Sequence, residues 1–375
     1  MAGSPTINTH LLSYRPSVEN VLRIIKHPGP WYCSTDLYTV YNAQTEISIK
    51  KKISFKITKG SVLTLKIGNV EITSDDKHAL KSSGRNIICP LRYKTKRREG
   101  LLNGYLLNLS AQPIPYQYVA ESLHISAEMG VLSLALCIDH LYYGCIMAKK
   151  EGEQVNAWFK SRSTSPSTSS LTLTTRLSIA QWTIAALIQL HQNGYIHRDF
   201  NDTNAVVDLS AGTVALIDFE FACRMESGAS KVALDVARTN GFTAPEIEDE
   251  SRYSQASDVY ALGCYFLAIL SQESEALGSE KRAPEWQASF MKVGFLKTQA
   301  DALVFLISRM RASAPKERPT CREVLGQFSA IFEGEPPLAA ALPCPRRAKP
   351  FFTEIAQLPG SDFGFDFIYT GGASL

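Results

Sequence analysis

The chain has 375 residues, of which 45% are hydrophobic and 20% are charged, and its formal net charge is +3. This composition is that of an ordinary globular protein with one large core or two modest ones. The chain lacks a run of about 18 apolar residues, and its N-terminus lacks the basic-then-apolar order of a secretory signal, so we expect a soluble, cytoplasmic protein. The eight cysteines form no C-x-x-C pair, which disfavours a structural zinc site and is typical of buried thiols in a reducing compartment.

The charge is distributed unevenly along the chain. Residues 1–110 carry 17 Lys or Arg against 7 Asp or Glu, whereas the remainder carries 22 against 29. The basic stretches 50–52 and 94–98 could therefore contact an acidic partner, phosphate groups or an anionic surface. A solvated basic face is the commoner origin of such stretches, and both interpretations stay open.

The first part of the chain is predicted to be β-rich. Apolar residues alternate with polar ones over 47–72, with glycines between the runs, and this period of two indicates strands and turns. Two further apolar runs, 131–138 and 141–147, suit adjacent strands. Between these β regions, 115–129 is predicted as a helix that a proline opens.

The second part is predicted to be helical. Residues 161–175 are rich in Ser and Thr and cannot offset their own ordering cost, so we expect a flexible loop there. Over 177–191 the apolar residues recur at spacings of three and four, and Gly194 supplies a stop. Similar periodic stretches follow near 259–270, 302–310 and 321–332. Strands first and helices later indicate an α+β fold, in two lobes.

One polar stretch, from Tyr195 to Arg224, points to chemistry. Asp199 is followed five positions later by Asn204, and a strand-like run then ends at Asp218. Phosphoryl transfer requires metal ions held against the phosphates and a carboxylate that orients the attacking hydroxyl. Asp199 would orient that hydroxyl, while Asn204 and Asp218 would ligate Mg²⁺ through oxygen, the ligand atom that hard cations prefer.

The same residues resemble the motifs of the protein-kinase family. His197, Arg198, Asp199 and Asn204 match the catalytic-loop pattern HRDxxxxN, and Asp218 begins a run that resembles the metal-binding DFG motif. The APE motif is matched by Ala244, Pro245 and Glu246, which begin 26 positions after Asp218, a normal length for an activation segment.

Three further matches extend the resemblance to about residues 117–333. The run 257–263 resembles the helix whose aspartate, here Asp258, anchors the catalytic loop. Arg318 resembles the arginine that forms a buried ion pair with the APE glutamate, here Glu246. Thr239 resembles the P+1-loop threonine of serine/threonine kinases.

The resemblance implies a two-lobed protein-kinase-like fold with a β-rich N-lobe and a helical C-lobe. It also implies ATP-dependent phosphoryl transfer to serine or threonine hydroxyls of a protein substrate, with ATP and Mg²⁺ as cofactors and Asp199 as the catalytic residue. The chain then divides into a divergent β-rich region, a kinase-like N-lobe, a kinase-like C-lobe and a C-terminal tail that resembles a docking or disordered extension, at 1–75, 76–148, 149–333 and 334–375.

The sequence departs from the family pattern at two positions near the chemistry. Glu220 replaces the glycine of DFG, which narrows the backbone freedom there and adds a carboxylate. Asn201 stands where serine/threonine kinases usually carry a lysine that helps to neutralise the transferring phosphate. These departures leave open a pseudokinase or kinase-like scaffold, or a small-molecule kinase of the choline or aminoglycoside type. A divergent kinase would also suit a viral, bacterial-effector or parasite protein in a host cell's cytoplasm or nucleus.

The N-lobe lacks a clean G-x-G-x-x-G loop, and 82–84 is its nearest substitute. Three positions compete for the ATP-binding lysine: Lys94, Lys66, and Asn108, which would leave the site without one. The helix partner is predicted as Glu121, with Glu128 second, and the adenine is expected to meet main-chain groups near Met147 and Ala148.

Overall fold

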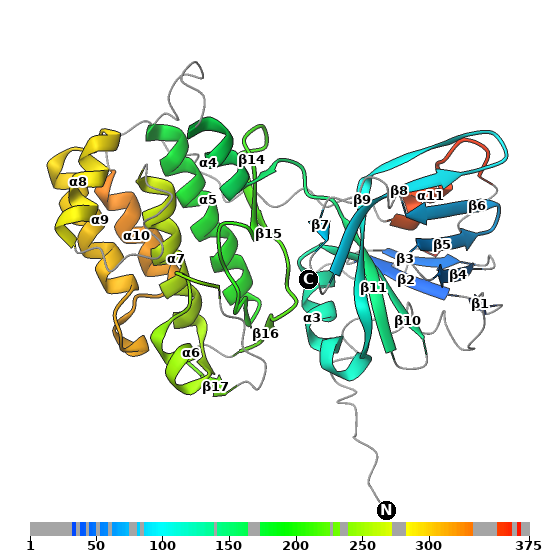
Figure 1. Cartoon of the computed structure of the whole chain (residues 1–375), viewed down its shortest axis with the longest axis horizontal. Helices are drawn as coiled ribbons and strands as arrows, with labels where there is room; N and C mark the ends of the chain where they lie inside the picture. The colour runs from blue at the N-terminus through cyan, green and yellow to red at the C-terminus, as the bar shows by residue number, and fades with distance from the viewer. Residues whose placement is uncertain are drawn as a thin grey trace, which may run out of the picture. The chain divides into compact units, whose positions relative to one another are not determined.

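The computed structural model of the chain describes two compact units, and each is presented by itself (Figure 1). Unit 1 comprises residues 1–149 with 347–375, and unit 2 comprises 150–346. The described residues are 32–34, 38–42, 45–49, 53–58, 62–74, 81–82, 86–138, 141–163, 173–225, 228–232, 239–271, 283–332, 351–361 and 366–368.

Unit 1 is built on one large antiparallel sheet. Its strand order is β1-β4-β5-β6-β8-β9-β11-β10, and β7 pairs with β8. The strands span Tyr32–Ser34 (β1), Ile53–Thr58 (β4), Val62–Ile67 (β5), Val70–Ser74 (β6), Lys81–Ser82 (β7), Asn86–Lys94 (β8), Glu99–Pro115 (β9), Leu132–Ile138 (β10) and Leu141–Ala148 (β11). A second sheet contains Tyr38–Asn42 (β2), Thr45–Ile49 (β3) and Asp366–Ile368 (β19). The predicted alternating strands are confirmed.

The large sheet runs through the predicted boundary at residue 75. Strand β6 pairs with β8, with Ile72 opposite Tyr93, so strands from both predicted N-terminal regions share one sheet. The physical reason is the shared apolar face. Ile67 and Ile72, from before the boundary, belong to the same buried cluster as Leu107 and Leu109 of β9, from after it. The strands on the two sides of residue 75 therefore share one hydrophobic core.

Two helices contribute to that buried cluster. Helix α3, Tyr116–Glu128, follows β9 directly, as the sequence predicts, and buries Val119 and Leu123. Helix α11, Phe351–Ala356, comes from the segment that we expected to be an extension, and it buries Phe351 and Ile355 in the same cluster. The ring of Phe351 lies edge-on to Tyr105 at 5.0 Å between ring centroids. This part of the tail therefore folds with unit 1.

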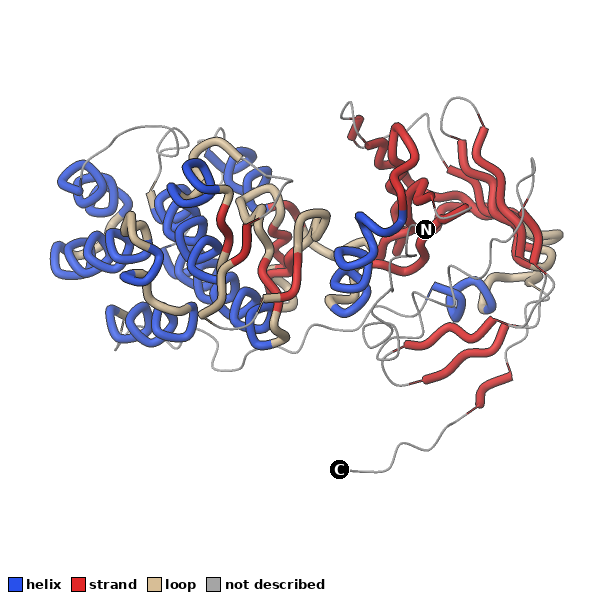
Figure 2. Tube along the Cα trace, turned by 90° about the horizontal axis from the view of Figure 1, so that it is seen from below, coloured by secondary structure: helices blue, strands red, loops and turns tan. Residues whose placement is uncertain are grey.

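Unit 2 is mainly helical (Figure 2). Its helix α7 is almost entirely buried, and α5 ends where Gly194 adopts φ 76°, as predicted. The other predicted helices are present, and residues 164–172 of the predicted loop lie outside the described part. The helices are Val155–Ser163 (α4), Leu173–Gln192 (α5), Pro245–Glu250 (α6), Gln255–Leu270 (α7), Ala283–Val293 (α8), Lys297–Met310 (α9) and Cys321–Ile331 (α10), with a 3-10 turn at Pro315–Glu317.

Short strand pairs frame the loops of unit 2. Strand β14 (Ala205–Asp208) pairs with β15 (Thr213–Leu216) and with β12 (Glu153–Gln154). The other pairs are β13 (Tyr195–Ile196) with β16 (Cys223–Arg224), and β17 (Lys231–Val232) with β18 (Arg252–Tyr253). A β-rich unit and a helical unit together confirm the predicted α+β fold. Within the described ranges, no helix is long and apolar enough to cross a membrane.

Candidate active site

A hairpin in unit 2 brings Asn204 and Asp218 together. Strands β14 and β15 pair from Ala205 opposite Leu216 to Asp208 opposite Thr213. The ladder continues beyond its open end, because the Ile217 amide donates to the Asn204 carbonyl at 3.0 Å. Asn204 and Asp218 therefore leave the same end of the hairpin, although 14 positions separate them in sequence.

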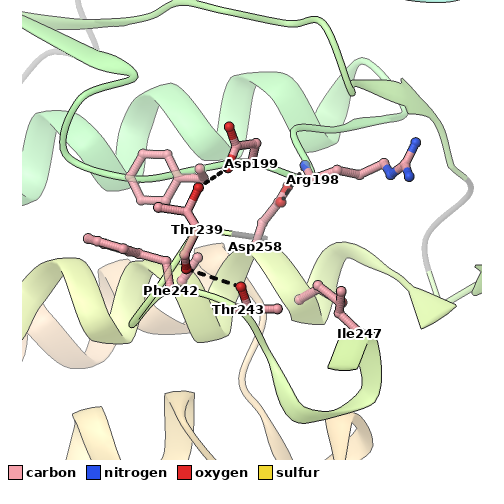
Figure 3. Close-up of a pocket in the computed structure, with 10 residues that line it drawn as sticks. Arg198, Asp199, Thr239, Phe242, Thr243, Ile247 and Asp258 are labelled. Atoms are coloured by element: carbon pink, nitrogen blue, oxygen red, sulfur yellow. Dashed lines mark hydrogen bonds between the residues drawn. The ribbon is translucent and has the colours of Figure 1, made fainter. Parts of the chain in front are cut away.

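The Asp199 carboxylate is held by hydrogen-bond donors from two segments (Figure 3). Thr239 Oγ1 donates to Asp199 Oδ1 at 2.5 Å. Asn204 Nδ2 donates to the Asp199 carbonyl at 2.8 Å and to Oδ2 at 3.2 Å. Burial raises the pKa of Asp199 and the charge of Asp218 raises it further, while the Thr239 and Asn204 hydrogen bonds oppose the rise. The predicted catalytic carboxylate is thus fixed in direction and close to a second acid.

The oxygen atoms beside Asp199 suit a hard cation. Asn204 directs Nδ2 to the main-chain carbonyl and to Oδ2 of Asp199, so its Oδ1 faces another direction, where it accepts a contact from Thr203 Oγ1 at 3.4 Å. Asp218 is exposed and presents a carboxylate from the neighbouring segment. An amide oxygen and a carboxylate are ligands that Mg²⁺ accepts alongside phosphate oxygens. Among the described residues, no group of three or more His, Cys, Asp or Glu could hold a metal ion.

Two residues of this site have left-handed backbone conformations. Arg198 has φ 68° and Asp218 has φ 62°, a region that costs a non-glycine residue about 1–3 kcal/mol. The neighbouring side chains hold these conformations in place. Phe219 is buried with its ring 5.1 Å from that of His197, and His197 Nε2 lies 3.1 Å from the Ile217 carbonyl. Such strain concentrates at functional sites, which supports the assignment of Asp218.

Asp258, on α7, anchors the loop that carries His197, Arg198 and Asp199. Its buried carboxylate accepts the His197 amide at 2.8 Å and the Arg198 amide at 3.1 Å. His191, at the end of α5, places Nε2 2.9 Å from the same carboxylate. The anchoring role of Asp258 follows the family resemblance, whereas the ion pair with His191 was not predicted. In the sequence, this ion pair was signalled only by a histidine at the end of an apolar helical pattern.

The His191–Asp258 pair should make stability depend on pH. Burial alone would lower the pKa of His191, but Cys321 and the Asp258 carboxylate outweigh burial and raise it from 6.5 to about 10. Burial alone would raise the pKa of Asp258, but the His191 contact and the loop amide lower it below 3.8. Since a raised histidine pKa stabilises the folded state fully only below the unfolded value, this contribution should be lost as the pH rises from 6.5 towards 10.

Urea unfolding across that pH range checks this prediction. The free energy of unfolding of the native chain should fall relative to that of His191→Gln by up to about 1.4 kcal/mol per pH unit. The variant is the matched control, since glutamine can donate a hydrogen bond without carrying a proton that titrates. Parallel curves for the two proteins would show that His191 is not charged in the folded state.

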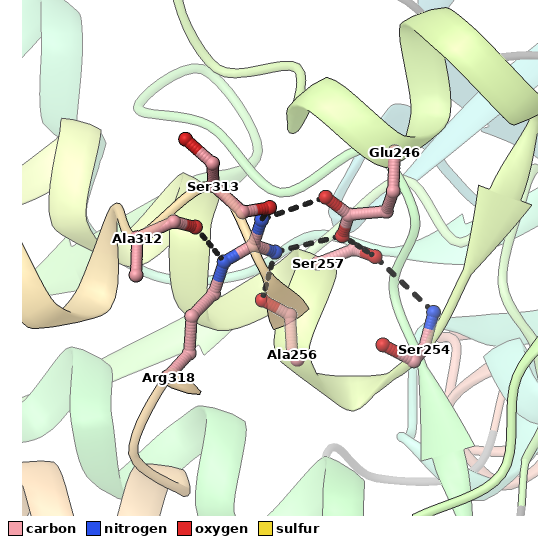
Figure 4. A network of polar contacts seen from close by, with 7 residues as sticks. All are labelled: Glu246, Ser254, Ala256, Ser257, Ala312, Ser313 and Arg318. Atoms are coloured by element: carbon pink, nitrogen blue, oxygen red, sulfur yellow. Dashed lines mark hydrogen bonds and ion pairs between the residues drawn. The ribbon is translucent and has the colours of Figure 1, made fainter. Parts of the chain in front are cut away.

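A second buried ion pair supports the segment after Thr239 (Figure 4). Arg318 donates from Nη1 and Nη2 to the two Glu246 oxygens, both at 2.7 Å. Its remaining donors reach the carbonyls of Ala312, Ala256 and Ser313. Ser257 Oγ adds a hydrogen bond to Glu246 at 2.8 Å. All five guanidinium N–H groups are therefore used, and the start of α6 is tied to the turn before α10.

A small pocket lies between the Asp199 loop and the segment from Thr239 to Ile247. Asp199 and Thr239 both line it and are hydrogen-bonded to each other, and the Arg198 side chain points away from Asp199 (Figure 3). The guanidinium of Arg198 instead lies 4.2 Å from the Tyr253 ring centroid and donates to the Phe221 carbonyl at 3.1 Å. The pocket residues are Arg198, Asp199, Phe200, Thr239, Phe242, Thr243, Ile247, Ser257, Asp258 and Ala261.

The three candidates for the ATP-binding lysine lie on different strands of unit 1. Lys94 is exposed at the end of β8, opposite Glu99 and Glu71, and Lys66 on β5 forms an ion pair with Glu71 at 3.0 Å. Asn108 lies in the middle of β9, opposite Ile88 and Cys145. Strand β9, which leads directly into α3, contains neither Lys nor Arg.

The remaining predicted nucleotide contacts also lie in unit 1. Glu121 is exposed on α3, and Met147 and Ala148 end β11. Ser82 ends β7, and the other two residues of the predicted phosphate loop lie outside the described part. Asp199, Asn204 and Asp218 all belong to unit 2, whereas the predicted nucleotide contacts above all belong to unit 1.

Comparison with known proteins agrees with this arrangement. The family model described as "Protein kinase domain" matches residues 139–328. A protein named as a probable serine/threonine-protein kinase of Dictyostelium discoideum is 27% identical over 43% of this chain and 17% of its own length. The serine/threonine-protein kinases PSK2 of Saccharomyces cerevisiae and WNG1 of Toxoplasma gondii are each 31% identical, over 38% and 40% of this chain and 12% and 20% of their own. The matches thus span a fifth or less of these relatives. The chain belongs to the protein kinase family.

Proposed function

We propose that the chain transfers the terminal phosphate of ATP to serine or threonine hydroxyls of a protein substrate. The observation that carries this proposal is the arrangement around Asp199. Its carboxylate accepts hydrogen bonds from Thr239 and Asn204, the charge of Asp218 acts on it, and Asn204 and Asp218 leave the same end of one hairpin. This supplies one group for the hydroxyl and two oxygen ligands for a cation, the set that phosphoryl transfer requires.

Each group has a defined task in this proposal. Asp199 orients the substrate hydroxyl and receives its proton, and its raised pKa makes it a better base than an exposed aspartate. Asn204 and Asp218 would hold Mg²⁺, which neutralises phosphate charge when bound. Thr239 lies on the pocket wall, and its match to the P+1-loop threonine favours serine or threonine as the acceptor. The matched relatives are named as kinases of that class.

A kinase-like binding protein is the second candidate, and a specific observation favours it. Strand β9, which leads into α3, contains Asn108 and has neither Lys nor Arg. If neither Lys94 nor Lys66 contacts the phosphates, nucleotide binding would depend on Mg²⁺ and main-chain groups. Such a protein would retain the loop geometry with little or no turnover.

Incubation of the purified full chain with labelled ATP and Mg²⁺ tests these candidates. The acceptors are a generic protein mixture, choline and an aminoglycoside, and Asp218→Ala and excess chelator serve as controls. Label in protein that both controls abolish supports the proposal, and phosphoamino-acid separation identifies the hydroxyl. Label in a small molecule alone, or none above Asp218→Ala, would exclude protein kinase activity.

A further inference from the structure

A basic turn joins β8 to β9 in unit 1. Thr95 closes this turn, because its amide donates to the Arg98 carbonyl at 2.7 Å and its hydroxyl oxygen accepts the amides of Arg97 and Arg98 at 3.3 and 3.0 Å. The side chains of Lys96, Arg97 and Arg98 are exposed, and we call residues 96–98 the basic tip. The tip therefore presents three consecutive cations on a backbone that local hydrogen bonds fix.

The segment after α11 holds the same turn from outside. Thr95 Oγ1 donates to the Pro359 carbonyl at 2.8 Å, and Asn69, in the turn between β5 and β6, donates from Nδ2 to the Gly360 carbonyl at 2.8 Å. Gly360 has φ 83°, and a Cβ at this position would come within 2.8 Å of Arg97 Cγ. Glycine thus allows the stem of Arg97 to pack against the segment, and the basic tip has a defined position on the sheet.

An exposed leucine lies beside the basic tip on the outer face of the same hairpin. Arg92 is opposite Leu101, and Lys94 is opposite Glu99. Opposite residues of an antiparallel pair have their side chains on the same face of the sheet. Leu101 is 48% exposed on this face, whereas Leu102, the next residue, is 2% exposed in the cluster on the other face. A large apolar side chain therefore stands among cations on the solvent side.

Basic side chains outnumber acidic ones on this outer face of β5, β6, β8 and β9. In the described part of the face, the acidic residues are Glu71, which pairs with Lys66 at 3.0 Å, and Glu99, which lies opposite Lys94. The basic residues are Lys66, Arg92, Lys94 and the three residues of the basic tip. Six basic side chains against two acidic ones leave a positive face, and that face attracts anions.

The surroundings of the tip favour a lipid surface over the other anionic partners. Strands β8 and β9 each have a neighbour on both sides, so this hairpin offers no free strand edge to an extended acidic peptide. Nucleic acids are commonly bound through exposed aromatic rings, but Tyr93 packs against the core, with its ring over Gly100. Cations beside an exposed leucine are instead the combination that the interface of an anionic bilayer accepts.

We propose that the basic tip and Leu101 bind an anionic phospholipid surface. The tip cations would meet the lipid phosphates, and Leu101 would enter the boundary between head groups and acyl chains. Each cation near such a surface strengthens binding by about fivefold, and salt at 0.1 M limits this attraction to about 10 Å. The site lies wholly in unit 1 and uses none of the groups around Asp199, so the inference does not depend on the proposed function.

Co-sedimentation of the purified full chain with lipid vesicles tests this site. The vesicles are phosphatidylcholine with phosphatidylserine, and pure phosphatidylcholine is the uncharged comparison. The double variant Lys96→Glu with Arg98→Glu should bind the anionic vesicles at least about 25-fold more weakly, because two tip cations are lost. The double variant Lys292→Glu with Arg322→Glu makes the same charge change at exposed sites of unit 2, and it should bind like the native chain.

A neutral substitution separates a lipid surface from other polyanions. Leu101→Ser keeps every charge and should weaken vesicle binding by about three- to tenfold, since less apolar surface enters the bilayer, while its retention on a heparin column stays native. Equal vesicle affinity of Leu101→Ser and the native chain would overturn the inference, even if the charge variant does not fold. Absence of native binding to the anionic vesicles at 0.1 M salt, or equal binding by the tip variant, would overturn it as well.

Discussion

Replacement of Asp199 by asparagine is expected to lower kcat for phosphate transfer by about 10²–10⁴-fold, the usual contribution of general base catalysis. Asparagine has the same shape and can still accept the hydrogen bond from Thr239, so the pocket should keep its form. It cannot receive the proton of the substrate hydroxyl. The loss should therefore appear in kcat, with the KM for ATP changed by no more than about twofold, as for an interaction made only in the transition state.

Steady-state kinetics with the best protein acceptor measures this effect, and calorimetric titration of nucleotide with Mg²⁺ checks that the site still binds. Asp249→Asn is the matched control, because Asp249 is exposed on α6 and the same chemical change there should leave kcat unaltered. Retention of more than about a tenth of native kcat by Asp199→Asn would remove Asp199 from the role of base.

Replacement of Arg318 by lysine should lower the free energy of unfolding by about 3–5 kcal/mol, the cost of breaking a buried ion pair from one side. Lysine is not a conservative substitute, because it cannot match the two Glu246 oxygens and three carbonyls with one ammonium group. A native domain is stable by only about 5–15 kcal/mol, so this loss would remove a large share of the stability of unit 2.

Urea denaturation of unit 2, followed by fluorescence, provides the measurement. The exposed pair of Arg252 and Glu250 serves as the control. Its N–O distance is 3.1 Å, but the side chains are 44% and 62% exposed, so Arg252→Lys should change stability by less than about 1 kcal/mol. Equal losses in the two variants would mean that burial does not decide the strength of the Glu246 pair.

Loss of the Glu246–Arg318 ion pair should also affect the candidate active site. Glu246 lies at the start of α6, three residues after Thr243, whose hydroxyl donates to the Thr239 carbonyl at 3.1 Å. Thr239 in turn holds the Asp199 carboxylate. Loss of the ion pair should therefore loosen the bond between Thr239 and Asp199 before the unit unfolds.

Much of this architecture could be predicted because it depends on local patterns. The alternation over 47–72 and the spacing of three and four over 177–191 report which face of an element is buried, and the corresponding strands and α5 are present. Asp199, Asn204 and Asp218 could be proposed from the sequence because all three belong to one short stretch, Tyr195 to Arg224. The ion pair between Glu246 and Arg318 was expected only from the family resemblance, since 72 positions separate the two residues.

Other features depend on contacts between distant segments and could not be predicted from local patterns. Helix α11 has only six residues, too few to show a period, and only its burial against Tyr105 and the sheet shows that it belongs to unit 1. The strand bounds likewise place the three candidates for the ATP-binding lysine on different strands, Asn108 on β9, Lys94 on β8 and Lys66 on β5.

The sequence by itself determined the α+β class, the family and the polar residues that could perform phosphoryl transfer, because these follow from periodicity and from closely spaced motifs. Only the tertiary structure decided how those residues are held. His191 lies 67 positions from Asp258, and Thr239 lies 40 positions from Asp199, so only folding brings these pairs into contact. The same holds for Asn201, which sequence shows as a missing lysine and the fold shows as an amide bonded to Asp199 and Thr203.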